Sequence, residues 1–421
     1  MHMEFSKISM IGLGYIGLPT AAVMASRGVE VIGVDVNEHA VATINEGRIH
    51  IVEPELDVLV HGAVAAGKLK AMTKPEKAQA FLIAVPTPFK GNHEPDVSYV
   101  EAAARSIAPV LEKGNLVILE STSPVGTTEK LAHWLSSARP DLSFPHQVGE
   151  SADINLAYCP ERVLPGHVVK ELVQNDRVIG GMTTRCAERA RALYQIFVQG
   201  ECVLTDARIA EMTKLTENAF RDVNIAFANE LSLICDKLDI NVWKLISLAN
   251  RHPRVNILNP GPGVGGHCIA VDPWFIVDSA PDTAKLIRQA RQVNDSKPHW
   301  VIGKVNQAIA ALGKAPSDVS VACLGLSFKA NIDDLRESPS LEIVEHIALE
   351  SSVKLLVVEP YIDELPPALA KCKNVEFVKL EEAIRRSEVV LLLVDHGSFK
   401  AVDTGALKGK VVVDTRGLWA E

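Results

Sequence analysis

The sequence predicts an α/β protein with two doubly wound domains joined by a long central helix and a helical dimerisation region. Short runs rich in Val and Ile alternate with helical patterns in the first half, which is typical of a parallel sheet wrapped by helices. A helical pattern without a strand follows over residues 206–236, and strand patterns return after residues 315–317. These observations predict three domains, over residues 1–205, 206–315 and 316–421.

The individual elements follow from the same patterns. In the first domain, strands are expected at 8–13, 29–34, 80–85, 116–120, 155–158 and 177–179. A helix is expected at 96–108, with Ser98 and Glu101 placed to form a capping box. Further helices are expected at 241–250 and 284–311, and strands of the last domain at 319–324, 354–358, 389–394 and 411–413. A helix of about thirty residues is long for a small domain, and we expect it to serve as the surface of a homodimer.

Composition excludes several classes of protein. The 421 residues are 47% hydrophobic and 23% charged, and 43 Lys and Arg against 52 Asp and Glu give a net charge of −9. This balance gives no support for binding to nucleic acid or to an anionic membrane. No apolar run approaches the roughly 18–20 residues that span a bilayer, and the first residues lack the apolar core of a secretory signal.

The seven cysteines are scattered singly along the chain. They lack the paired spacing of a disulfide framework, and there is neither a CxxC nor an HExxH pattern, so no metal is expected. Without an export signal, scattered cysteines indicate reduced thiols and a cytoplasmic protein.

A glycine-rich loop follows the first expected strand. Its sequence, Gly12-Leu13-Gly14-Tyr15-Ile16-Gly17, allows a tight turn, a close approach of backbone to a pyrophosphate, and close packing of helix on strand. The second strand ends at Asp35, where an acid can accept both ribose hydroxyls and repel a 2′-phosphate. The loop therefore predicts a Rossmann-like domain that binds NAD in preference to NADP. The alternative is an ordinary strand-to-helix turn, with Asp35 capping the next helix.

Two threonines follow later strands of the same sheet. Thr87 lies in Pro86-Thr87-Pro88, and Thr122 follows Glu120-Ser121. Ligands of such sheets bind at the carboxyl ends of the strands, so both threonines are candidates for the cofactor site. Plain turn chemistry explains their positions equally well.

A second glycine-rich stretch leads into a cysteine. Residues 261–266 are mostly glycine and proline, Cys268 follows, and Asp272 comes four positions later. Backbone amides in such a loop can approach a ligand closely and activate a thiol. The equally simple interpretation is a turn at a helix start with a buried cysteine that acts as a small hydrophobe.

Three polar residues recur along one face of the central helix. Lys214, Asn218 and Arg221 have the spacing i, i+4, i+7. Such a row is usually a solvated face. Here we expect the helix to be largely buried, because it also carries strongly apolar neighbours, namely Phe220, Val223, Ile225 and Phe227. A buried Lys or Arg needs an anionic partner, which favours a site.

The last domain opens with a charged segment after its first strand. Phe328-Lys329 begins this segment, and Arg336-Glu337-Ser338-Pro339 ends it. Two cations between a strand end and a helix start suit a phosphate site, and a surface loop of mixed charge is the simple alternative.

Together these stretches resemble the UDP-glucose/GDP-mannose 6-dehydrogenase family over essentially the whole chain. The order agrees throughout: the GxGxxG loop, Glu120-Ser121-Thr122, Tyr158-Cys159-Pro160-Glu161-Arg162, the Lys214 and Asn218 helix, the Gly-Gly-x-Cys loop, and the Phe-Lys to Arg-Glu-Ser-Pro segment. The chain departs from the family pattern at Val271, where a lysine usually precedes the aspartate.

That departure, with His267 and residues 250–256, resembles the branch of the family that acts on 2-acetamido sugars. The resemblance implies oxidation of UDP-N-acetyl-D-mannosamine at C6 to the uronate, for a bacterial surface polysaccharide of the enterobacterial common antigen type. The alternatives are the same chemistry on UDP-N-acetylglucosamine or on UDP-glucose.

The resemblance also implies residue roles. Cys268 would form the covalent intermediate, Lys214 would stabilise an oxyanion or relay a proton, and Asn218 would orient the same group or a water. Asp272 and Glu161 are both candidates to activate water. Arg336 matches a position near the cofactor, and Arg254 one that reaches a neighbouring subunit's site. Positions expected around the sugar nucleotide are Arg162, Val163, Lys214, Asn218, Arg221, His252, Arg254, Gly265, Phe328 and Lys329.

Two other classes remain as alternatives. An NAD-dependent epimerase retains its hydride, but the sequence has no Tyr-x-x-x-Lys pair. An NAD-binding scaffold with a decayed site would not need the full set of Lys214, Asn218, Cys268 and Asp272 that this chain carries.

Overall fold

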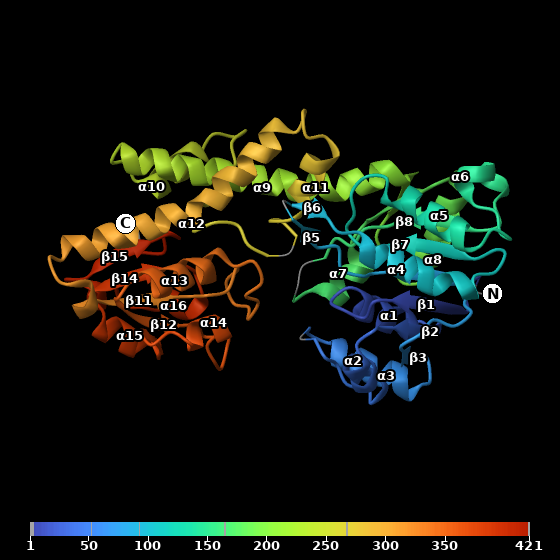
Figure 1. The fold of residues 1–421 in the computed structure, drawn as a ribbon, viewed down its shortest axis with the longest axis horizontal. Helices are drawn as coiled ribbons and strands as arrows, with labels where there is room; N and C mark the ends of the chain where they lie inside the picture. The colour runs from blue at the N-terminus through green and yellow to red at the C-terminus, as the bar shows by residue number, and fades with distance from the viewer. Residues whose placement is uncertain (1–3, 52, 92, 164–165, 267, 420–421) are drawn as a thin grey trace. The chain divides into compact units, whose positions relative to one another are not determined.

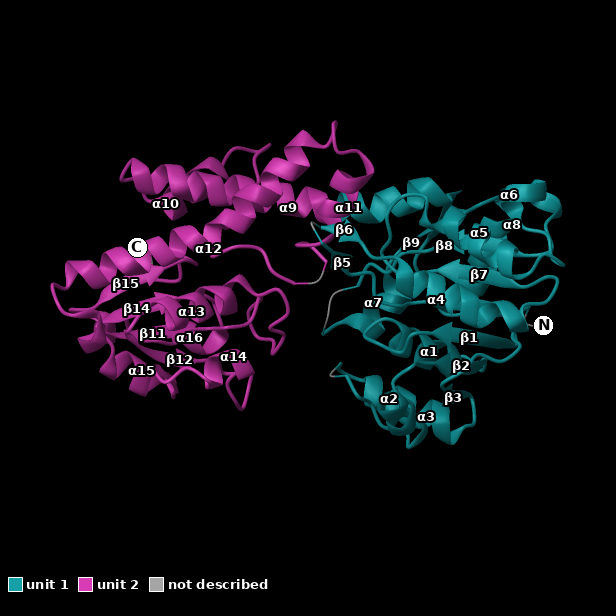
Figure 2. Ribbon diagram, in the orientation of Figure 1, with its two compact units in different colours: residues 1–217 teal, residues 218–421 magenta. Residues whose placement is uncertain are grey.

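The computed structural model describes residues 4–51, 53–91, 93–163, 166–266 and 268–419 (Figure 1). The chain divides into two compact units, Met1–Glu217 and Asn218–Glu421 (Figure 2). The division falls inside the long helix α9 (Ala207–Lys237), which therefore contributes residues to both units. Across the described residues, no helix is both long enough and apolar enough to cross a membrane.

The first unit is built on one mixed sheet. Its described strands have the order β10-β9-β8-β7-β4-β1-β2-β3. Their bounds are β1 Lys7–Ile11, β2 Glu30–Val34, β3 Leu69–Met72, β4 Ala80–Ile83, β7 Leu116–Leu119, β8 Asn155–Tyr158, β9 Arg177–Gly181 and β10 Cys202–Asp206. A short hairpin, β5 (Phe89–Lys90) and β6 (Glu94–Pro95), lies outside this sheet.

One pair of strands departs from the expected parallel sheet. Strands β8 and β9 pair antiparallel, whereas β9 and β10 pair parallel with each other. Among the described residues between β8 and β9, the one helix is the short α7 (Val168–Gln174). The segment does not return to the opposite end of the strands. Strand β9 therefore starts at the end of the sheet where β8 finishes, and it runs in the opposite direction.

Helices cover both faces of this sheet, as a doubly wound fold requires (Figure 1). Along β1, Ile8 and Met10 belong to one apolar core, while Ile11 belongs to the other. The helices of the unit are α1 Gly17–Ser26, α2 Glu38–Asn45, α3 Leu56–Ala65, α4 Ser98–Ile107, η1 Ala108–Val110, α5 Thr127–Ala138, α6 Pro145–Val148, η2 Gly149–Ser151, α7, and α8 Thr184–Tyr194.

The predicted capping box at α4 is wrong. Val97 occupies the N-cap position, and the helix itself begins at Ser98. The side chain that bonds there belongs to Asp96, whose Oδ1 accepts the Ser98 backbone N–H at 3.0 Å. Ser98 is one position too late in the chain to act as the cap.

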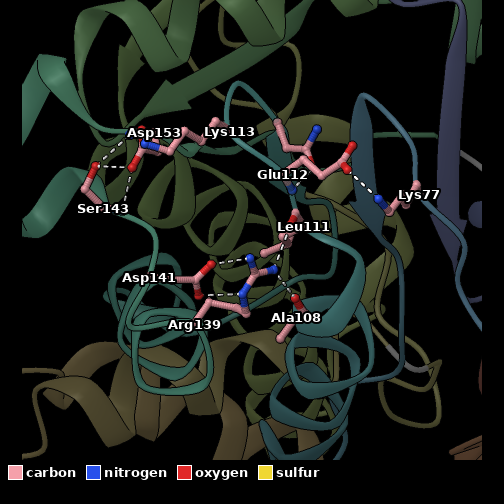
Figure 3. A network of polar contacts seen from close by, with 10 residues as sticks. Lys77, Ala108, Leu111, Glu112, Lys113, Arg139, Asp141, Ser143 and Asp153 are labelled. Atoms are coloured by element: carbon pink, nitrogen blue, oxygen red, sulfur yellow. Dashed lines mark hydrogen bonds and ion pairs between the residues drawn. The ribbon is translucent and has the colours of Figure 1, made fainter.

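A polar network lies at the amino-terminal ends of β7 and β8 (Figure 3). Arg139 donates to the carbonyl oxygens of Ala108 and Leu111 at 2.9 and 2.7 Å, and also pairs with Asp141. Asp153 accepts from the backbone N–H of Ser143 at 3.0 Å. Ligands bind at the carboxyl ends of strands in such folds, so this network stabilises the sheet edge away from the site.

The second unit contains a smaller, fully parallel sheet. Its described strands have the order β13-β12-β11-β14-β15. Their bounds are β11 Ser320–Leu324, β12 Lys354–Val358, β13 Val375–Phe377, β14 Val389–Leu392 and β15 Val411–Asp414. The helices after α9 are α10 Val242–Ala249, α11 Asp272–Ser279, α12 Lys285–Ala311, η3 Pro316–Asp318, α13 Pro339–Glu350, α14 Pro367–Ala370, α15 Leu380–Arg386, α16 Gly397–Lys400 and η4 Thr404–Leu407.

Buried polar side chains join α9 to α12. Arg291 donates to Asp222 Oδ1 at 2.6 Å, and Asn229 donates to Asn294 Oδ1 at 2.9 Å. The same Asn229 accepts the backbone N–H of Gly261 at 2.9 Å. The start of the glycine-rich loop is thereby anchored to both long helices.

The expectation that α9 is largely buried is wrong for the single chain. Phe220 is 70% exposed and Phe227 is 51% exposed. Ile234, seven positions further on, is 47% exposed. These three apolar residues lie one above another at heptad spacing and form a surface stripe along the helix.

Candidate active site

The glycine-rich loop after β1 has the geometry of a dinucleotide site. Gly12 has φ of 92°, and a Cβ there would lie 2.4 Å from the Ala84 oxygen. At Gly17 a Cβ would lie 1.8 Å from the Gly12 oxygen, whereas Gly14 faces open space. Tyr15 and Ile16 lie at the turn before α1. The loop is therefore tight where helix and strand must pack and open where a pyrophosphate would approach, which fits NAD.

Asp35 lies half-buried at the end of β2, next to this loop. Its Oδ2 accepts the Leu13 backbone N–H at 2.9 Å, and its Oδ1 accepts the Asn37 N–H at 2.9 Å. The cap of α2 is Asn37, whose side chain accepts from His39 and Ala40. The alternative in which Asp35 caps the helix is therefore wrong, and its remaining lone pairs suit ribose hydroxyls.

The two threonines after later strands come together. Thr87 Oγ1 donates to the Thr122 carbonyl oxygen at 2.5 Å, although 35 positions separate them. Beside them, the hydroxyl of Ser121 accepts the Val85 N–H at 2.9 Å. The carboxyl ends of β4 and β7 are thus tied together next to the cofactor loop.

Glu161 is a buried carboxylate with a buried cation. Arg177 NH1 donates to Glu161 Oε2 at 2.6 Å, and the side-chain exposures are 2% for Arg177 and 7% for Glu161. The other oxygen accepts the Arg162 backbone N–H at 2.7 Å. The ion pair fixes the position of the Glu161 carboxylate. Arg177 was not among the sequence-based candidates, although an arginine at the start of a buried strand signals a buried acid.

Glu120 and Tyr194 extend this cluster. Tyr194 donates to Glu120 Oε1 at 2.6 Å, and both side chains are buried. Burial raises the pKa of Glu120 to about 7, against the lowering effect of the Tyr194 hydrogen bond. Burial also raises the pKa of the neighbouring Cys159 thiol to about 12, so Cys159 is an inert thiol.

Arg162 and Val163 follow Glu161 in the same turn. Arg162 NH2 lies 2.6 Å from Glu217 Oε1 on α9, so this predicted substrate residue is oriented by an acid. Val163 packs against the core of the first unit. An arginine held in this way presents its remaining N–H groups in a fixed direction.

Lys214 and Asn218 lie one turn apart on α9, and both are half-buried. Asn218 Nδ2 donates to Asp272 Oδ2 at 2.5 Å. Asp272 is 3% exposed and is the first residue of α11. The structure therefore joins two of the predicted catalytic residues.

Cys268 lies in the turn that leads into α11. Its carbonyl oxygen accepts the Asp272 N–H at 2.8 Å and the Val271 N–H at 3.1 Å. The expectation of a helix-start turn is therefore confirmed. The alternative of a fully buried thiol is wrong, because Cys268 is only half-buried. A partly exposed thiol beside a helix N-terminus is accessible to a substrate.

The glycine loop before Cys268 packs against the charged segment of the last domain. A Cβ at Gly265 would lie 2.3 Å from the Glu337 oxygen and 2.8 Å from Phe328 Cβ. Gly266 N–H donates to the Arg336 carbonyl oxygen at 3.2 Å. Arg336 also binds Asp334 through its guanidinium, at 2.6 Å from NH2 to Oδ2. Two motifs that are far apart in the sequence thus form one surface.

A cavity lies beside this surface. It is lined by Phe328 and Lys329 together with Gly263, Pro339 and Arg416. Arg416 NH2 lies 2.8 Å from Asp395, and its NH1 is 2.6 Å from where a Gly261 Cβ would lie. Arg416 was missed in the sequence, since it follows the last strand without any local motif.

Three predicted substrate residues are exposed in the single chain, namely Arg221, His252 and Arg254. Arg254 N–H donates to His252 Nδ1 at 3.3 Å. His267, which distinguished the branch of the family in the sequence, lies outside the described residues.

Comparison with protein families covers nearly the whole chain. Residues 6–198 match the NAD binding domain of the UDP-glucose/GDP-mannose dehydrogenase family. Residues 208–296 match its central domain, and residues 322–421 match its UDP binding domain. The glycine-rich loop at residues 12–17 thus falls in the region that matches the NAD binding domain. Arg416, which lines the cavity, falls in the region that matches the UDP binding domain.

Individual relatives agree with this. The chain is 66% identical to an NDP-N-acetyl-D-galactosaminuronic acid dehydrogenase of Ralstonia nicotianae, over 100% of this chain and 98% of the relative. It is 63% identical to the UDP-N-acetyl-D-mannosamine dehydrogenase of Yersinia pestis, over 99% and 100%. Its fold matches a UDP-D-ManNAc dehydrogenase from Pyrococcus horikoshii with a TM-score of 0.88 and 39% identity, over 99% of this chain and 96% of that one.

Proposed function

Because the chain belongs to the UDP-glucose/GDP-mannose dehydrogenase family, we propose that it oxidises UDP-N-acetyl-D-mannosamine at C6 to the uronate. The chain is an NAD-dependent dehydrogenase of nucleotide sugars. The observation that carries the proposal is the hydrogen bond from Asn218 on α9 to Asp272. Asp272 is the first residue of α11, the helix that follows Cys268.

The reaction has two oxidations. One alcohol, two NAD⁺ and one water give one carboxylate, two NADH and three protons. NAD, when bound, would supply the hydride acceptor for each oxidation at C6. The Cys268 thiolate adds to the aldehyde carbon to form a thiohemiacetal, and its oxidation gives a thioester that water cleaves.

The remaining residues act around the reacting carbon. Lys214 stabilises the oxyanion or takes its proton, and Asn218 orients the same group. Asp272 is the candidate to direct water at the thioester, because its carboxylate lies on the first turn after Cys268. Glu161, held in place by its ion pair with Arg177, is the second candidate.

The binding residues divide between the two nucleotides. In this proposal Gly12, Gly14, Tyr15, Ile16, Gly17, Asp35, Thr87, Thr122 and Arg336 bind NAD. The sugar nucleotide contacts Arg162, Val163, Arg221, His252, Arg254 and Gly265, with Phe328 and Lys329 at its phosphates. We retain residues 1–205, 206–315 and 316–421 as the NAD-binding, central and UDP-sugar-binding domains.

The stoichiometry of NADH tests the chemistry. We expect a ratio near two NADH per UDP-N-acetylmannosamine, and a ratio near one would reduce the protein to an alcohol dehydrogenase. Cys268→Ser should stall after the first oxidation, because a serine hydroxyl is a far weaker nucleophile than a thiolate and does not give the adduct that the second oxidation needs. Cys372→Ser, another half-buried thiol, is the matched control and should keep full turnover. Two-NADH turnover by Cys268→Ser would refute the thioester route.

A second candidate substrate is the N-acetylgalactosamine analogue. It is favoured by the 66% identical relative from Ralstonia nicotianae, whose name specifies the galactosaminuronic acid. Rates of NADH formation with the mannosamine, galactosamine and glucosamine nucleotides, and with UDP-glucose, distinguish these substrates. A preference for UDP-glucose would contradict the 2-acetamido branch. With the mannosamine substrate, the uronate would supply a bacterial surface polysaccharide of the enterobacterial common antigen type.

We also propose a homodimer built on α9, in the cytoplasm. Phe220, Phe227 and Ile234 form an exposed stripe at heptad spacing, which a second copy of α9 would cover. Arg254 would then reach the neighbouring subunit's site. All seven cysteines are free thiols, as a reducing compartment keeps them.

Light scattering with Phe227→Glu tests the dimer. We expect this variant to be monomeric, while Leu349→Glu, an exposed control on α13, stays dimeric. A monomeric native chain would refute the proposal.

A further inference from the structure

Strands β1 and β11 end in the same backbone geometry, although they belong to different units. Gly12 has φ of 92°, and Gly325 has φ of 96°. Gly12 N–H donates to the Val34 carbonyl oxygen at 2.8 Å, and Gly325 N–H donates to the Val358 oxygen at 2.9 Å. The second unit thus repeats the turn that opens the NAD loop of the first.

The acid that follows is repeated as well. Leu13 N–H donates to Asp35 at the end of β2, at 2.9 Å. Leu326 N–H donates to Glu359 at the end of β12, at 2.7 Å. Glu359 therefore occupies in the second unit the position that Asp35 occupies in the first, where an acid would bind a ribose.

Glu359 differs from Asp35 in its partner. Asp35 is half-buried, whereas Glu359 is buried and lies 3.1 Å from the Nε2 of the buried His396. Burial alone would raise the pKa of Glu359. Hydrogen bonds from His396 and from the Leu326 and Ser327 amides outweigh it and lower this pKa below its usual value. The carboxylate is thus committed to internal partners instead of a ribose.

His396 contacts the other end of the same loop. Its Nδ1 accepts the Asn331 backbone N–H at 2.9 Å. A ring nitrogen that accepts carries no proton, so Nε2 bears the proton and donates to Glu359. Ser327 N–H also donates to Glu359, at 3.0 Å. The His396–Glu359 pair therefore holds residues 326–331 at both ends.

This loop carries the residues that face the cavity. Phe328 and Lys329 line it together with Arg416. Phe328 also lies against the glycine loop before Cys268, within 3.0 Å of where a Gly266 Cβ would lie. A shift of the loop would move both the cation and the ring that face the ligand.

We propose that His396 and Glu359 are positioning residues: an acid at the position where the first unit has Asp35 here serves as an anchor that fixes Phe328 and Lys329 for the UDP moiety. The inference rests on the proposed function for the assignment of this cavity to UDP. The repeated Gly–acid turn and the histidine added to it support the role of this pair as an anchor.

The test is calorimetric titration of the full chain with UDP and, separately, with NADH. His396→Phe removes both the donor to Glu359 and the acceptor for Asn331. We expect its UDP dissociation constant to rise at least tenfold, and that of NADH, whose proposed site lies in the first unit apart from Arg336, to stay within twofold. His396→Gln keeps one acceptor and one donor and should bind UDP within threefold of the native chain.

Controls separate the possible failures. His346→Gln changes a half-buried histidine that pairs with Glu350 and should leave both affinities unchanged. Native UDP affinity in His396→Phe, with weak binding in Lys329→Ala, would overturn the anchor alone. Native affinity in Lys329→Ala would overturn the assignment of the cavity to UDP. Parallel loss of UDP and NADH binding in both His396 variants would show general unfolding and would also overturn the anchor.

Discussion

Asn218 on α9 and Asp272 at the start of α11 are joined by a hydrogen bond of 2.5 Å between Nδ2 and Oδ2. The bond connects α9 to the turn of Cys268, because Asp272 N–H also donates to the Cys268 carbonyl oxygen at 2.8 Å. Asn218 and the turn of the proposed nucleophile are thereby held in one arrangement.

Removal of this bond should impair the chemistry more than the binding. We expect Asn218→Ala to lower kcat by about 10²–10³-fold, because an oriented hydrogen-bond donor at a reacting group has this effect. The KM for NAD should change little. Steady-state NADH formation measures both constants. Asn224→Ala on the same helix, where the amide bonds to the Phe220 carbonyl oxygen, is the control. A kcat within threefold of the native value in Asn218→Ala would contradict the role.

The buried Arg177–Glu161 pair should be costly to break from one side. Arg177→Met leaves a carboxylate that is 7% exposed without its cation, and we expect a loss of about 3–5 kcal/mol in the stability of the first unit. The double variant with Glu161→Gln should recover part of this loss. Thermal unfolding measures the loss of stability in each variant. The control is Arg105→Ala, which breaks an exposed pair with Glu101 and should cost less than about 0.5 kcal/mol. Equal effects of Arg177→Met and Arg105→Ala would refute the argument.

Glu120 should make stability depend on pH. Its pKa is raised from 4.5 to about 7, so the folded state binds more protons than the unfolded state between these values. The contribution of Glu120 to the free energy of unfolding should therefore be fully present below pH 4.5. It should be lost as the pH rises through 7, which lowers the free energy of unfolding by at most about 3 kcal/mol. Tyr194, Cys159, Glu161 and Arg177 surround this group.

Glu120→Gln keeps the acceptor for Tyr194 but cannot ionise. Its stability relative to the native chain should therefore be greater at pH 8 than at pH 5, as measured by urea unfolding at both values. An equal difference at the two values would exclude ionisation of Glu120 as the cause.

Local patterns were sufficient to predict some parts of the site. Gly12, Gly14, Gly17 and Asp35 lie within one strand–helix–strand unit, so spacing alone predicts where they meet. The bounds of the long helices follow from periodicity, because a helix of this length repeats its apolar face many times.

Other parts depend on contacts between distant segments. Arg177 reaches Glu161 through the antiparallel return of β9, a reversal that no periodicity reveals. The apolar side chains of α9 were wrongly expected to be buried, because the pattern that marks a core also marks a surface covered by a partner. Arg416 meets the glycine loop only through the folded second unit.

The buried Lys297 should produce the opposite pH dependence to Glu120. Its side chain is 2% exposed, donates to Ser232 and lies 3.8 Å from the centre of the Trp300 ring. Burial lowers its pKa from 10.5 to about 7, so the unfolded state binds more protons between these values. Stability should therefore increase as the pH rises from 7 towards 10.5.

Lys297→Met removes the charge and keeps most of the apolar volume. We expect it to raise the thermal midpoint of the second unit at pH 7 and to abolish the rise between pH 7 and 10. Lys285→Met, at the exposed start of α12, is the matched control and should leave that rise in place. If the stability of Lys297→Met still rises between pH 7 and 10, a group other than Lys297 causes the rise.

Asp35 should decide which dinucleotide binds. Its carboxylate is oriented by the Leu13 and Asn37 amides, at 2.9 Å each, and repels a 2′-phosphate. Asp35→Ser should lower kcat/KM for NAD by about tenfold to a hundredfold, because two ribose hydroxyls lose a charged acceptor. The efficiency with NADP should rise at the same time, since the repulsion is gone. Asp57→Ser on α3, in the same unit, is the control for a lost surface charge. Comparable efficiency of the native chain with NAD and NADP would overturn the role of Asp35.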